Sequence, residues 1–425
     1  MLIFLVFFVI IASALTFGLS RSIYSDISLV NSLLTSKQSY LMAEAALEDA
    51  IFKVMAGNPV NNISVINSLT GKSTTTISYD SFNDVYTVSS TAQVGKAKRV
   101  SVVELIPGAG SAFNYGLQTG NGGFNLVNSA SITGNVFSNG SIVGQGSSII
   151  RGDVISAGPS GLISRITATG TVWTNTLNQS TITGNAYYNV VGGISTVGGV
   201  RHIPAAIIPA EALPVGDTKV EEWKTSIQST GTIIPVTSCS GGWYEININT
   251  TIGNLKVECN LRIRKSGAST IVTLTGPVWV VGNIEFDQGP RIVVSPSLGR
   301  RSVQIIADNP ANRLTSSKIS IRNSTEFVGS GHAASHIMVL SQNNSAELGG
   351  TEVAIDIGQS SNGALLLYSG HGLINIGNSI FLKSVTAYKT SIGNNSNVVY
   401  DRGLANVLFT GGPGGGYVIR SWYQK

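Results

Sequence analysis

The chain has 425 residues, of which 12% are charged and 42% hydrophobic, and it contains 49 glycines. The charged share is about half that of an average soluble protein, and glycine is well above its average share. Disordered chains combine high charge with low hydrophobicity, so this composition excludes general disorder and indicates β-structure with many tight turns. The net charge of +5 is scattered, without a basic run that would indicate nucleic-acid binding. A chain this long is expected to form two or three domains.

Residues 1–56 are predicted to form one long helix with a transmembrane part and an amphipathic part. Residues 1–19 carry no charge and are long enough to cross the hydrocarbon layer as a helix. Apolar residues continue at helical spacing between 23 and 34, and Leu41–Met55 is rich in strong helix formers. The sequence GNP at 57–59 is a stop signal. Such a helix would be roughly 84 Å long at 1.5 Å per residue. It suits an element anchored in a membrane and packed in a bundle.

The apolar N-terminus and the run SKQSYLMAEAALEDAI, which begins at Ser36, resemble the N-terminal region of PilX-like minor pilins and related type IV pilus-assembly proteins. The resemblance implies a bacterial single-pass membrane protein whose C-terminal bulk is extracytoplasmic, with other pilins or pilus-assembly proteins as partners. Prepilins carry a basic leader and usually Glu at the fifth mature position, whereas this chain has Leu5 and no acidic residue before Asp26. Two alternatives follow: a start that lies upstream, or anchoring without pilin processing. A plain signal anchor with an outside domain is a further alternative.

Residues 57–107 are predicted to form a small antiparallel β meander. Three β-rich runs between Ser73 and Ile106 are separated by turn-forming residues at 80–84 and 93–96. A long helix laid against such a meander is also the layout that the pilin resemblance implies. The sequence PGAG that begins at Pro107 marks the boundary of this region.

Residues 111–200 contain a six-residue glycine grid that predicts a parallel β-helix. An apolar residue often stands two places after a grid point, and the grid is interrupted only by Asn128 and Ser164. Units with a short fixed period stack on their neighbours instead of forming separate cores. A flexible Gly/Ser linker is the alternative, but linkers do not place Val and Ile in register. The run SITGNVFSNGSI also resembles bactofilin β-helices. The grid glycines are Gly116, Gly122, Gly134, Gly140, Gly146, Gly152, Gly158 and Gly170, and the unit at Gly184 comes four residues early.

The remaining chain is predicted to leave the stack, return to it and close it. Residues 201–230 hold three of the twelve prolines and indicate an excursion with a short helix at Thr218–Ile227. Residues 231–400 are predicted to form irregular β-helix coils that carry loops. Residues 401–425 are two alternating runs around GGPGGG, predicted to be a capping hairpin, because an uncovered last coil would pair with other chains. The expected fold class is α+β: the long helix and small meander, then a mostly parallel β-helix closed by this hairpin.

Cys239 and Cys259 are the only cysteines and lie about one coil apart. An even count on a membrane-anchored chain predicts a disulfide in an oxidising exterior, where it would staple neighbouring coils. Two thiolates without a nearby histidine cannot complete the four ligands of a structural metal site. We therefore expect no metal ion and no cofactor.

No catalytic site is predicted. Gly71-Lys72-Ser73 matches the end of a phosphate-binding loop by residue type only, and it enters a strand instead of a helix. His332 and His336 are expected to be surface residues, because no acidic residue lies between them as a metalloprotease would require. β-Helix enzymes that cleave polysaccharides use clustered acidic residues. The candidates here are singly spaced: Glu285, Asp287, Asp308 and Asp356.

We expect a non-enzymatic, membrane-anchored pilus-assembly or minor-pilin-like structural protein that projects a β-helix from the cell surface. The membrane and other pilins would be its partners, and nucleic acid would not. The first alternative is a signal-anchored cell-surface adhesin that binds a glycan or a protein. The second is a β-helix polysaccharide lyase or hydrolase.

Overall fold

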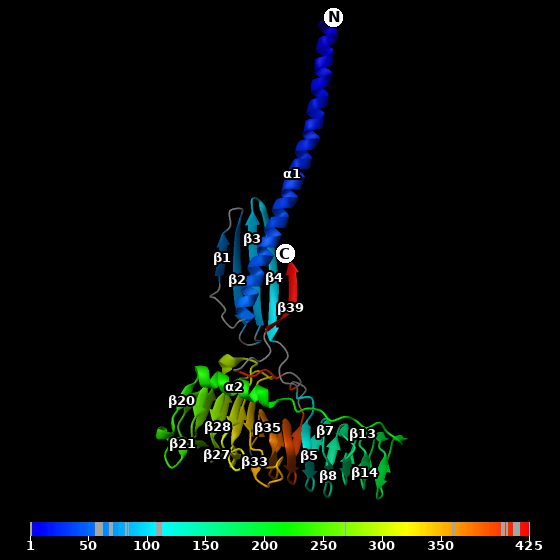
Figure 1. Cartoon of the computed structure of the whole chain (residues 1–425), viewed down its shortest axis with the longest axis vertical. Helices are drawn as coiled ribbons and strands as arrows, with labels where there is room; N and C mark the ends of the chain where they lie inside the picture. Colours follow the sequence, from blue (N-terminus) through cyan, green and yellow to red (C-terminus); the bar gives the residue numbers. More distant parts are fainter. Residues whose placement is uncertain are drawn as a thin grey trace. The chain divides into compact units, whose positions relative to one another are not determined.

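A computed structural model describes residues 2–55, 63–67, 71–80, 83, 85–107, 113–267, 269–358, 362–400, 404, 407–410 and 417–424. The chain divides into two compact units. The first comprises Met1–Asp80, Asp84–Gly108 and Gly416–Lys425, and the second comprises Ser81–Asn83 and Ala109–Gly415. The predicted fold class of a long N-terminal helix, an antiparallel meander and mostly parallel stacked strands is confirmed (Figure 1).

The first unit consists of α1 (Leu2–Met55) and a five-stranded antiparallel sheet. The three strands predicted as a meander pair in sequence order, and a two-residue turn at Gly95, with φ +58°, joins the second to the third. An early strand and the C-terminal strand extend the sheet at its two edges. In sheet order the strands are β1 (Ile63–Asn67), β2 (Lys72–Asp80), β3 (Val85–Val94), β4 (Ala97–Pro107) and β39 (Tyr417–Gln424).

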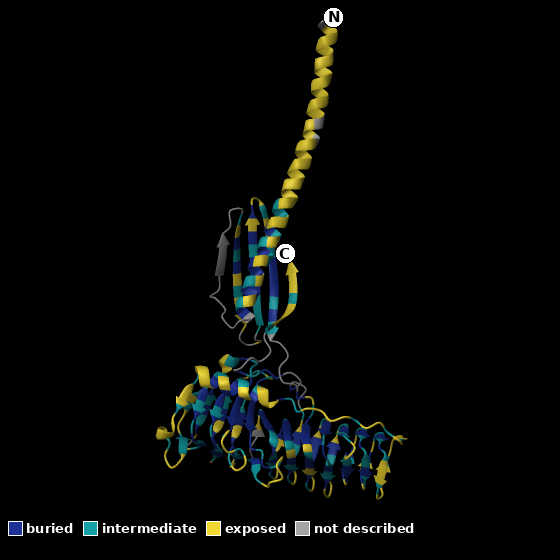
Figure 2. Cartoon of the chain, in the orientation of Figure 1, coloured by how far each residue is buried: buried dark blue, intermediate teal, exposed yellow. Residues whose placement is uncertain are grey.

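The C-terminal part of α1 packs on this sheet through one narrow stripe. Ala43, Leu47, Ala50 and Val54 are at most 3% exposed, and their spacing of four, three and four residues places them on one helix face. They pack against buried strand residues such as Val103. The small alanine side chains let the helix approach the sheet closely. Figure 2 shows this stripe as the buried side of an otherwise exposed helix.

The second unit is a solenoid whose coils each contribute strands to three parallel faces. The inward residues Val136, Ile142 and Val154 are fully buried, as the glycine grid predicts. Val136 pairs with Val154 and Val154 with Val172, and the shortened unit then pairs Val172 with Ala186. The strands of this N-terminal half are β5 (Leu117–Leu126), β6 (Ser131–Thr133), β7 (Val136–Ser138), β8 (Ile142–Gly144), β9 (Ile149–Arg151), β10 (Val154–Ser156), β11 (Leu162–Ser164), β12 (Thr167–Ala168), β13 (Val172–Trp173), β14 (Thr176–Asn178), β15 (Thr181–Ile182), β16 (Ala186–Tyr187), β17 (Val190–Gly192), β18 (Thr196–Val197) and β19 (Arg201–His202).

The C-terminal half of the solenoid has longer, less regular coils, as predicted. Short 3₁₀ turns, η1 (Val236–Ser238) and η2 (Pro296–Leu298), lie in two of its loops. Its strands are β20 (Thr232–Ile234), β21 (Trp243–Ile246), β22 (Thr250–Ile252), β23 (Leu255–Val257), β24 (Asn260–Arg264), β25 (Ile271–Leu274), β26 (Val278–Val280), β27 (Ile284–Asp287), β28 (Arg291–Val294), β29 (Val303–Ala307), β30 (Ile319–Ile321), β31 (Glu326–Val328), β32 (Ile337–Ser341), β33 (Val353–Ile357), β34 (Asn362–Gly363), β35 (Leu365–Ile376), β36 (Phe381–Leu382), β37 (Ser384–Ile392) and β38 (Asn397–Val399).

The two halves stack out of chain order. The last coil of the C-terminal half lies on the first coil of the N-terminal half, where Val385 pairs with Leu117 and Val398 pairs with Ile132. The ends of the stack are therefore the coil that ends in β19 and the coil that begins with β20. The segment 203–216 and helix α2 (Asp217–Thr230) join these ends by running back along the stack (Figure 1).

Two different constraints select glycine at the corners. Gly134 and Gly146 have φ of +127° and +59°, in the region that side chains disfavour. Gly152 is required by close approach instead, because a Cβ there would lie 2.3 Å from the carbonyl oxygen of Gly134 in the preceding coil. Gly170 repeats this relationship with Gly152 at 2.4 Å. Positive φ thus explains part of the grid and coil-to-coil contact explains the rest.

The structure corrects the prediction at the C-terminus. Residues 401–425 do not form a capping hairpin, because β39 pairs with β4 in the first unit. Leu404 and Val407 are fully buried in a second core of the solenoid, below α2. An alternating apolar run fits any free strand edge, so its pattern does not reveal which strand it will join. Helix α2 is found where a short helix was predicted, with longer bounds than Thr218–Ile227.

Candidate functional site

The N-terminal part of α1 is an apolar surface that no other described part of the chain covers. Every described side chain from Ile3 to Leu34 is exposed, and Arg21 and Asp26 are the only charged residues in this stretch. None of its most apolar stretch is buried. By length and composition the helix can cross a membrane, a test that signal sequences and core helices also pass. Its complete exposure separates it from a core helix.

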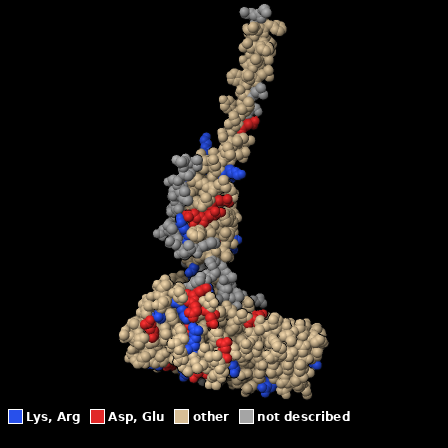
Figure 3. Space-filling model, in the orientation of Figure 1, with Lys and Arg blue, Asp and Glu red and all other residues tan. Residues whose placement is uncertain are grey.

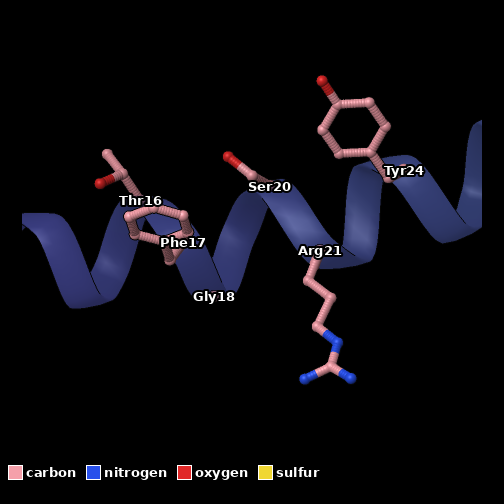
Figure 4. Close-up of a pocket in the computed structure, with 6 residues that line it drawn as sticks. All are labelled: Thr16, Phe17, Gly18, Ser20, Arg21 and Tyr24. Carbon is pink, nitrogen blue, oxygen red and sulfur yellow. The ribbon is translucent and has the colours of Figure 1, made fainter.

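A hollow on α1 is lined by residues of adjacent turns that lie on more than one side of the helix (Figure 4). Phe17 and Tyr24 form its apolar rim, while Arg21 projects away from Tyr24 in this view. Gly18 has no other atom within 4 Å of the position where a Cβ would lie. The hollow is a groove between helix side chains, so it suits packing against lipid or another helix better than enclosure of a small molecule. Its lining residues are Thr16, Phe17, Gly18, Ser20, Arg21 and Tyr24.

Charge is distributed unequally along the solenoid. Between 113 and 200 the sequence has only three charged residues, Arg151, Asp153 and Arg165. The C-terminal half carries many more, and Figure 3 shows both signs interspersed over it on the visible face. Several form pairs between neighbouring coils, such as Arg262 with Glu285 at 2.9 Å. Most of the N-terminal half is thus an uncharged surface of hydroxyl, amide and aromatic groups.

An aromatic ladder lies on the outside of the last three coils of this half. Trp173, Tyr187 and His202 occupy one register position in successive coils. Their rings stack with centroids 5.4 Å and 4.1 Å apart and interplanar angles of 10° and 6°. All three side chains are half-buried. Each ring stands three places after a corner glycine, Gly170, Gly184 or Gly199, but the unequal spacing of these glycines hid the ladder from a search with one fixed period.

The four acidic candidates of the sequence do not converge on one site. Glu285 pairs with Arg262, and Asp287 accepts a hydrogen bond from Asn323. Asp356 lies two coils from Glu285 in the same outward column and accepts a hydrogen bond from Asn375. Asp308 is fully buried elsewhere, below α2. Within the described parts of the chain, no three His, Cys, Asp or Glu side chains are placed to hold a metal ion.

Asp308 belongs to a four-charge cluster that the sequence did not predict. Its carboxylate contacts Lys224 of α2 at 2.5 Å and Arg313 at 2.8 Å. Glu221, one turn before Lys224, contacts the ammonium group of Lys224 at 2.6 Å and the guanidinium group of Arg313 at 3.2 Å. The cluster thus holds two cations and two anions. It joins two local pairs, Glu221 with Lys224 and Asp308 with Arg313, that are far apart in the chain, so no local pattern could have identified the whole cluster.

A second cluster fixes the N-terminus of α2. His371 lies between two carboxylates, with Nε2 2.9 Å from Asp217 and Nδ1 2.5 Å from Glu347. Burial lowers the pKa of His371, but its hydrogen bonds to both carboxylates outweigh this effect, so the pKa is raised. Burial raises the pKa of Asp217, and the contact with His371 outweighs it, so that pKa is lowered.

The remaining residues that the sequence analysis considered are two histidines, the Gly71-Lys72-Ser73 run and the two cysteines. His336 is 2% exposed, so the expectation that it is a surface residue is wrong; it precedes the buried strand β32 and its Nδ1 lies 3.1 Å from the Ala334 oxygen. His332 is half-buried and its Nδ1 accepts a hydrogen bond from the Ala334 amide. Lys72 begins strand β2, so Gly71-Lys72-Ser73 enters a strand as expected. Cys239 and Cys259 form a disulfide between the first two coils of the C-terminal half.

No protein-family model matches the chain, and no curated protein matches it significantly in sequence. Among solved structures, the competence-associated pilin ComZ from Thermus thermophilus aligns at 12% identity and a TM-score of 0.22, over 92% of this chain and 97% of that one. An ice binding protein from an Antarctic bacterium, Flavobacteriaceae, aligns at 11% identity and a TM-score of 0.16, over 67% of this chain and 81% of that one. At these TM-scores neither neighbour indicates a shared fold.

Proposed function

We propose that the protein is a non-enzymatic, membrane-anchored structural protein of the minor-pilin or pilus-assembly kind, which projects its solenoid from a bacterial cell surface. One observation carries the proposal: α1 changes its surroundings along its length. Its described side chains are exposed up to Leu34, with only Arg21 and Asp26 charged, and from Ser39 onward one face is buried against the antiparallel sheet. The same continuous helix therefore supplies an anchor and a rigid connection to a folded unit.

The transition between these parts is fixed by specific contacts. Ser39 is fully buried, and its hydroxyl accepts a hydrogen bond from the Val94 amide and donates one to the Ala97 oxygen. These contacts hold α1 against the turn between β3 and β4. The Arg99 guanidinium group of β4 also donates to the Ser36 hydroxyl, and from Leu34 back to Ile3 every described side chain is exposed. A bilayer and the helices of other subunits supply the apolar surroundings that such a surface requires.

The part of α1 between the most apolar stretch and Ser39 is suited to helix packing. Ile23, Ile27, Val30 and Leu34 recur at steps of four, three and four, and each is at least 51% exposed. We propose that this stripe packs against equivalent helices of partner pilins or assembly proteins. The PilX-like motif that begins at Ser36 supports the same family of partners, and the solenoid is then the part presented outside the membrane.

Membrane partition tests the anchor. Deleting residues 1–19 should release a soluble protein, whereas the full chain should require detergent for extraction. Leu5→Arg and Ile10→Arg should each weaken insertion by about 3 kcal/mol. Tyr24→Arg, which adds the same charge beyond the most apolar stretch, is the matched control and should remain membrane-bound. Recovery of the full chain in the soluble fraction without detergent would contradict the proposal.

A surface adhesin is the second candidate, and the aromatic ladder favours it. Binding surfaces for glycans and proteins commonly use aromatic and hydroxyl groups. The stacked, half-exposed rings beside an uncharged surface resemble such a binding surface. Trp173→Ala should then reduce binding in a glycan array or cell-adhesion assay, with the exposed residue Ile194→Ala as control. Loss of binding in both variants, or in neither, would argue against this candidate.

A further inference from the structure

The four-charge cluster below α2 places an amine against a carboxyl group with little access to water. The Lys224 side chain is 5% exposed and that of Asp308 is 0% exposed, and Nζ lies 2.5 Å from Oδ2. The Trp279 ring lies beside them: its centroid is 5.2 Å from Lys224 Nζ, and its Nε1 donates a hydrogen bond to the Asp308 backbone oxygen. The fully buried Trp223 and the second solenoid core complete the surroundings. The two reacting groups are therefore themselves buried, whereas Glu221, on the solvent side of the cluster, is 54% exposed.

We propose that Lys224 and Asp308 are joined by an intramolecular isopeptide bond. The Lys224 Nζ–Asp308 Cγ bond forms, and the bond from Cγ to one carboxylate oxygen breaks. An ammonium and a carboxylate contain all the atoms required: nitrogen loses two protons, which leave with the released oxygen as one water molecule. The first proton passes from Nζ to the Asp308 carboxylate, so that the lone pair of a neutral amine attacks Cγ of a neutral carboxyl group. The second proton then passes from nitrogen to the released hydroxyl group, which leaves as water. No oxidant, reductant or further reactant takes part.

Two other members of the cluster are placed to assist this step. Glu221 Oε1, 2.6 Å from Lys224 Nζ, can accept the second proton and pass it to the leaving oxygen. Arg313 donates to both carboxylate oxygens at 2.8 Å, through Nε to Oδ1 and through Nη2 to Oδ2. Negative charge grows on an Asp308 oxygen when nitrogen attacks, and these fixed donors can stabilise that charge.

Burial favours the amide over the ion pair. In water, separate ammonium and carboxylate ions are stabilised by solvation, which they lose when both are buried. Amide formation removes one cation and one anion from the cluster and releases the water it produces. Arg313 and Glu221 remain, already 3.2 Å apart, so the residual charge is also balanced. Because the fold already holds Nζ next to the carboxyl group, the reaction avoids the entropy cost of bringing two free molecules together.

The mass of the full chain tests the bond directly. The detergent-extracted protein is reduced, so that the disulfide does not contribute, and its intact mass is measured. A bond predicts a mass lower than the sequence mass by one water, and a digest in which an α2 peptide is joined to the peptide that contains Asp308. The full sequence mass with two separate peptides would overturn the proposal and leave an ordinary buried ion pair.

Variants distinguish this bond from loss of water elsewhere. Lys224→Arg keeps the positive charge but cannot form the amide, so it should have the full mass. Lys256→Arg is the matched control, because Lys256 also lies over the Trp279 ring but pairs with Glu258, and it should still lack one water. The Glu221→Gln variant should form the bond, and so lose one water, more slowly after synthesis. Loss of one water in Lys224→Arg would place the reaction at another site and overturn the proposal.

Discussion

Ile106 and Val418 are cross-strand partners in the antiparallel pair of β4 and β39, although almost the entire solenoid lies between them in the chain. Leu105 and Ile419, the next pair, continue this register into the sheet. The solenoid is therefore inserted between two neighbouring strands of the first unit. Domain insertions are tolerated where the two points of connection lie close together.

This relationship predicts that the first unit folds without the solenoid. Replacing residues 109–415 with a short Asn-Gly hairpin turn should leave α1 packed on a five-stranded sheet. Amide protons of β3 and β4 should then exchange with solvent as slowly as in the full chain. As control, ending the chain at Pro107 removes β39, exposes the edge of β4 and should accelerate exchange there. Rapid exchange throughout both chains would show that the first unit depends on the solenoid.

The buried stripe of α1 should be sensitive to truncation. Leu47 is fully buried, so Leu47→Ala should lower the free energy of unfolding of the first unit by about 2 to 5 kcal/mol. Phe52 is 72% exposed on the same helix, and Phe52→Ala should change it by less than about 0.5 kcal/mol. Denaturant titration of the shortened protein measures both. Equal effects would indicate that α1 does not dock on the sheet as described.

Adding even one methyl group at a solenoid corner should be destabilising where two coils are in contact. Gly152→Ala places Cβ 2.3 Å from the Gly134 oxygen and should destabilise the solenoid by about 1 to 3 kcal/mol through overpacking. At Gly358 a Cβ would have no atom closer than 3.5 Å, an ordinary contact, so Gly358→Ala should be nearly neutral. Thermal unfolding followed by tryptophan fluorescence compares the two variants. A neutral Gly152→Ala would contradict the predicted stacking of coils.

The sequence predicted the solenoid well because its signal is local. The spacing that ends in Gly170 is set by contact between one coil and the next, so a single period reports the fold. The junction at which Val385 pairs with Leu117 could not be predicted, because any coil edge offers the same unpaired backbone groups. For the same reason the C-terminal run was predicted to cap the solenoid and instead joins β4. Polar contacts were also missed: the Asn139 side chain exchanges hydrogen bonds with the Glu211 backbone and holds the segment before α2.

The disulfide between Cys239 and Cys259 should stabilise the first coil of the C-terminal half. The bond closes a loop with a sequence separation of 20, which contributes about 3 kcal/mol in the chain-entropy model. Thiol labelling of the exported protein should find no free thiol before reduction. A double Cys→Ser variant should be cleaved sooner by protease near Trp243, while the aromatic ladder region is unaffected. Two reactive thiols in native, exported protein would disprove the pairing.

Docking of the N-terminus of α2 should depend on pH through His371. Because the pKa of His371 is raised on folding, its contribution to the stability of the docked helix is present below the ordinary value of 6.5. That contribution is lost as the pH rises through the folded value. The pKa of Asp217 is lowered, so its contribution is present above 3.8 and is lost as the pH falls. The contact should therefore be strongest between these values, with Glu347, Arg313 and Gln342 as the other polar groups near the pair.

Hydrogen exchange of α2 amides, corrected for the intrinsic effect of pH, measures this contact. Protection of the first turn should decrease as the pH rises above the folded pKa of His371. His371→Gln should remove the decrease, and His332→Gln, outside the cluster, should retain it. A pH profile that is unchanged by His371→Gln would assign the dependence to another group.

The central claim is that α1 anchors the protein in the membrane with both folded units on the extracytoplasmic side. Thr183 is an exposed solenoid residue, and Thr183→Cys introduces a thiol there while the native cysteines are paired. Intact cells or spheroplasts are treated with a membrane-impermeant thiol reagent, and labelling is compared with that after lysis. The proposal predicts full labelling before lysis, together with retention of the labelled chain in the membrane fraction. Labelling only after lysis would place the solenoid inside the cell and contradict it.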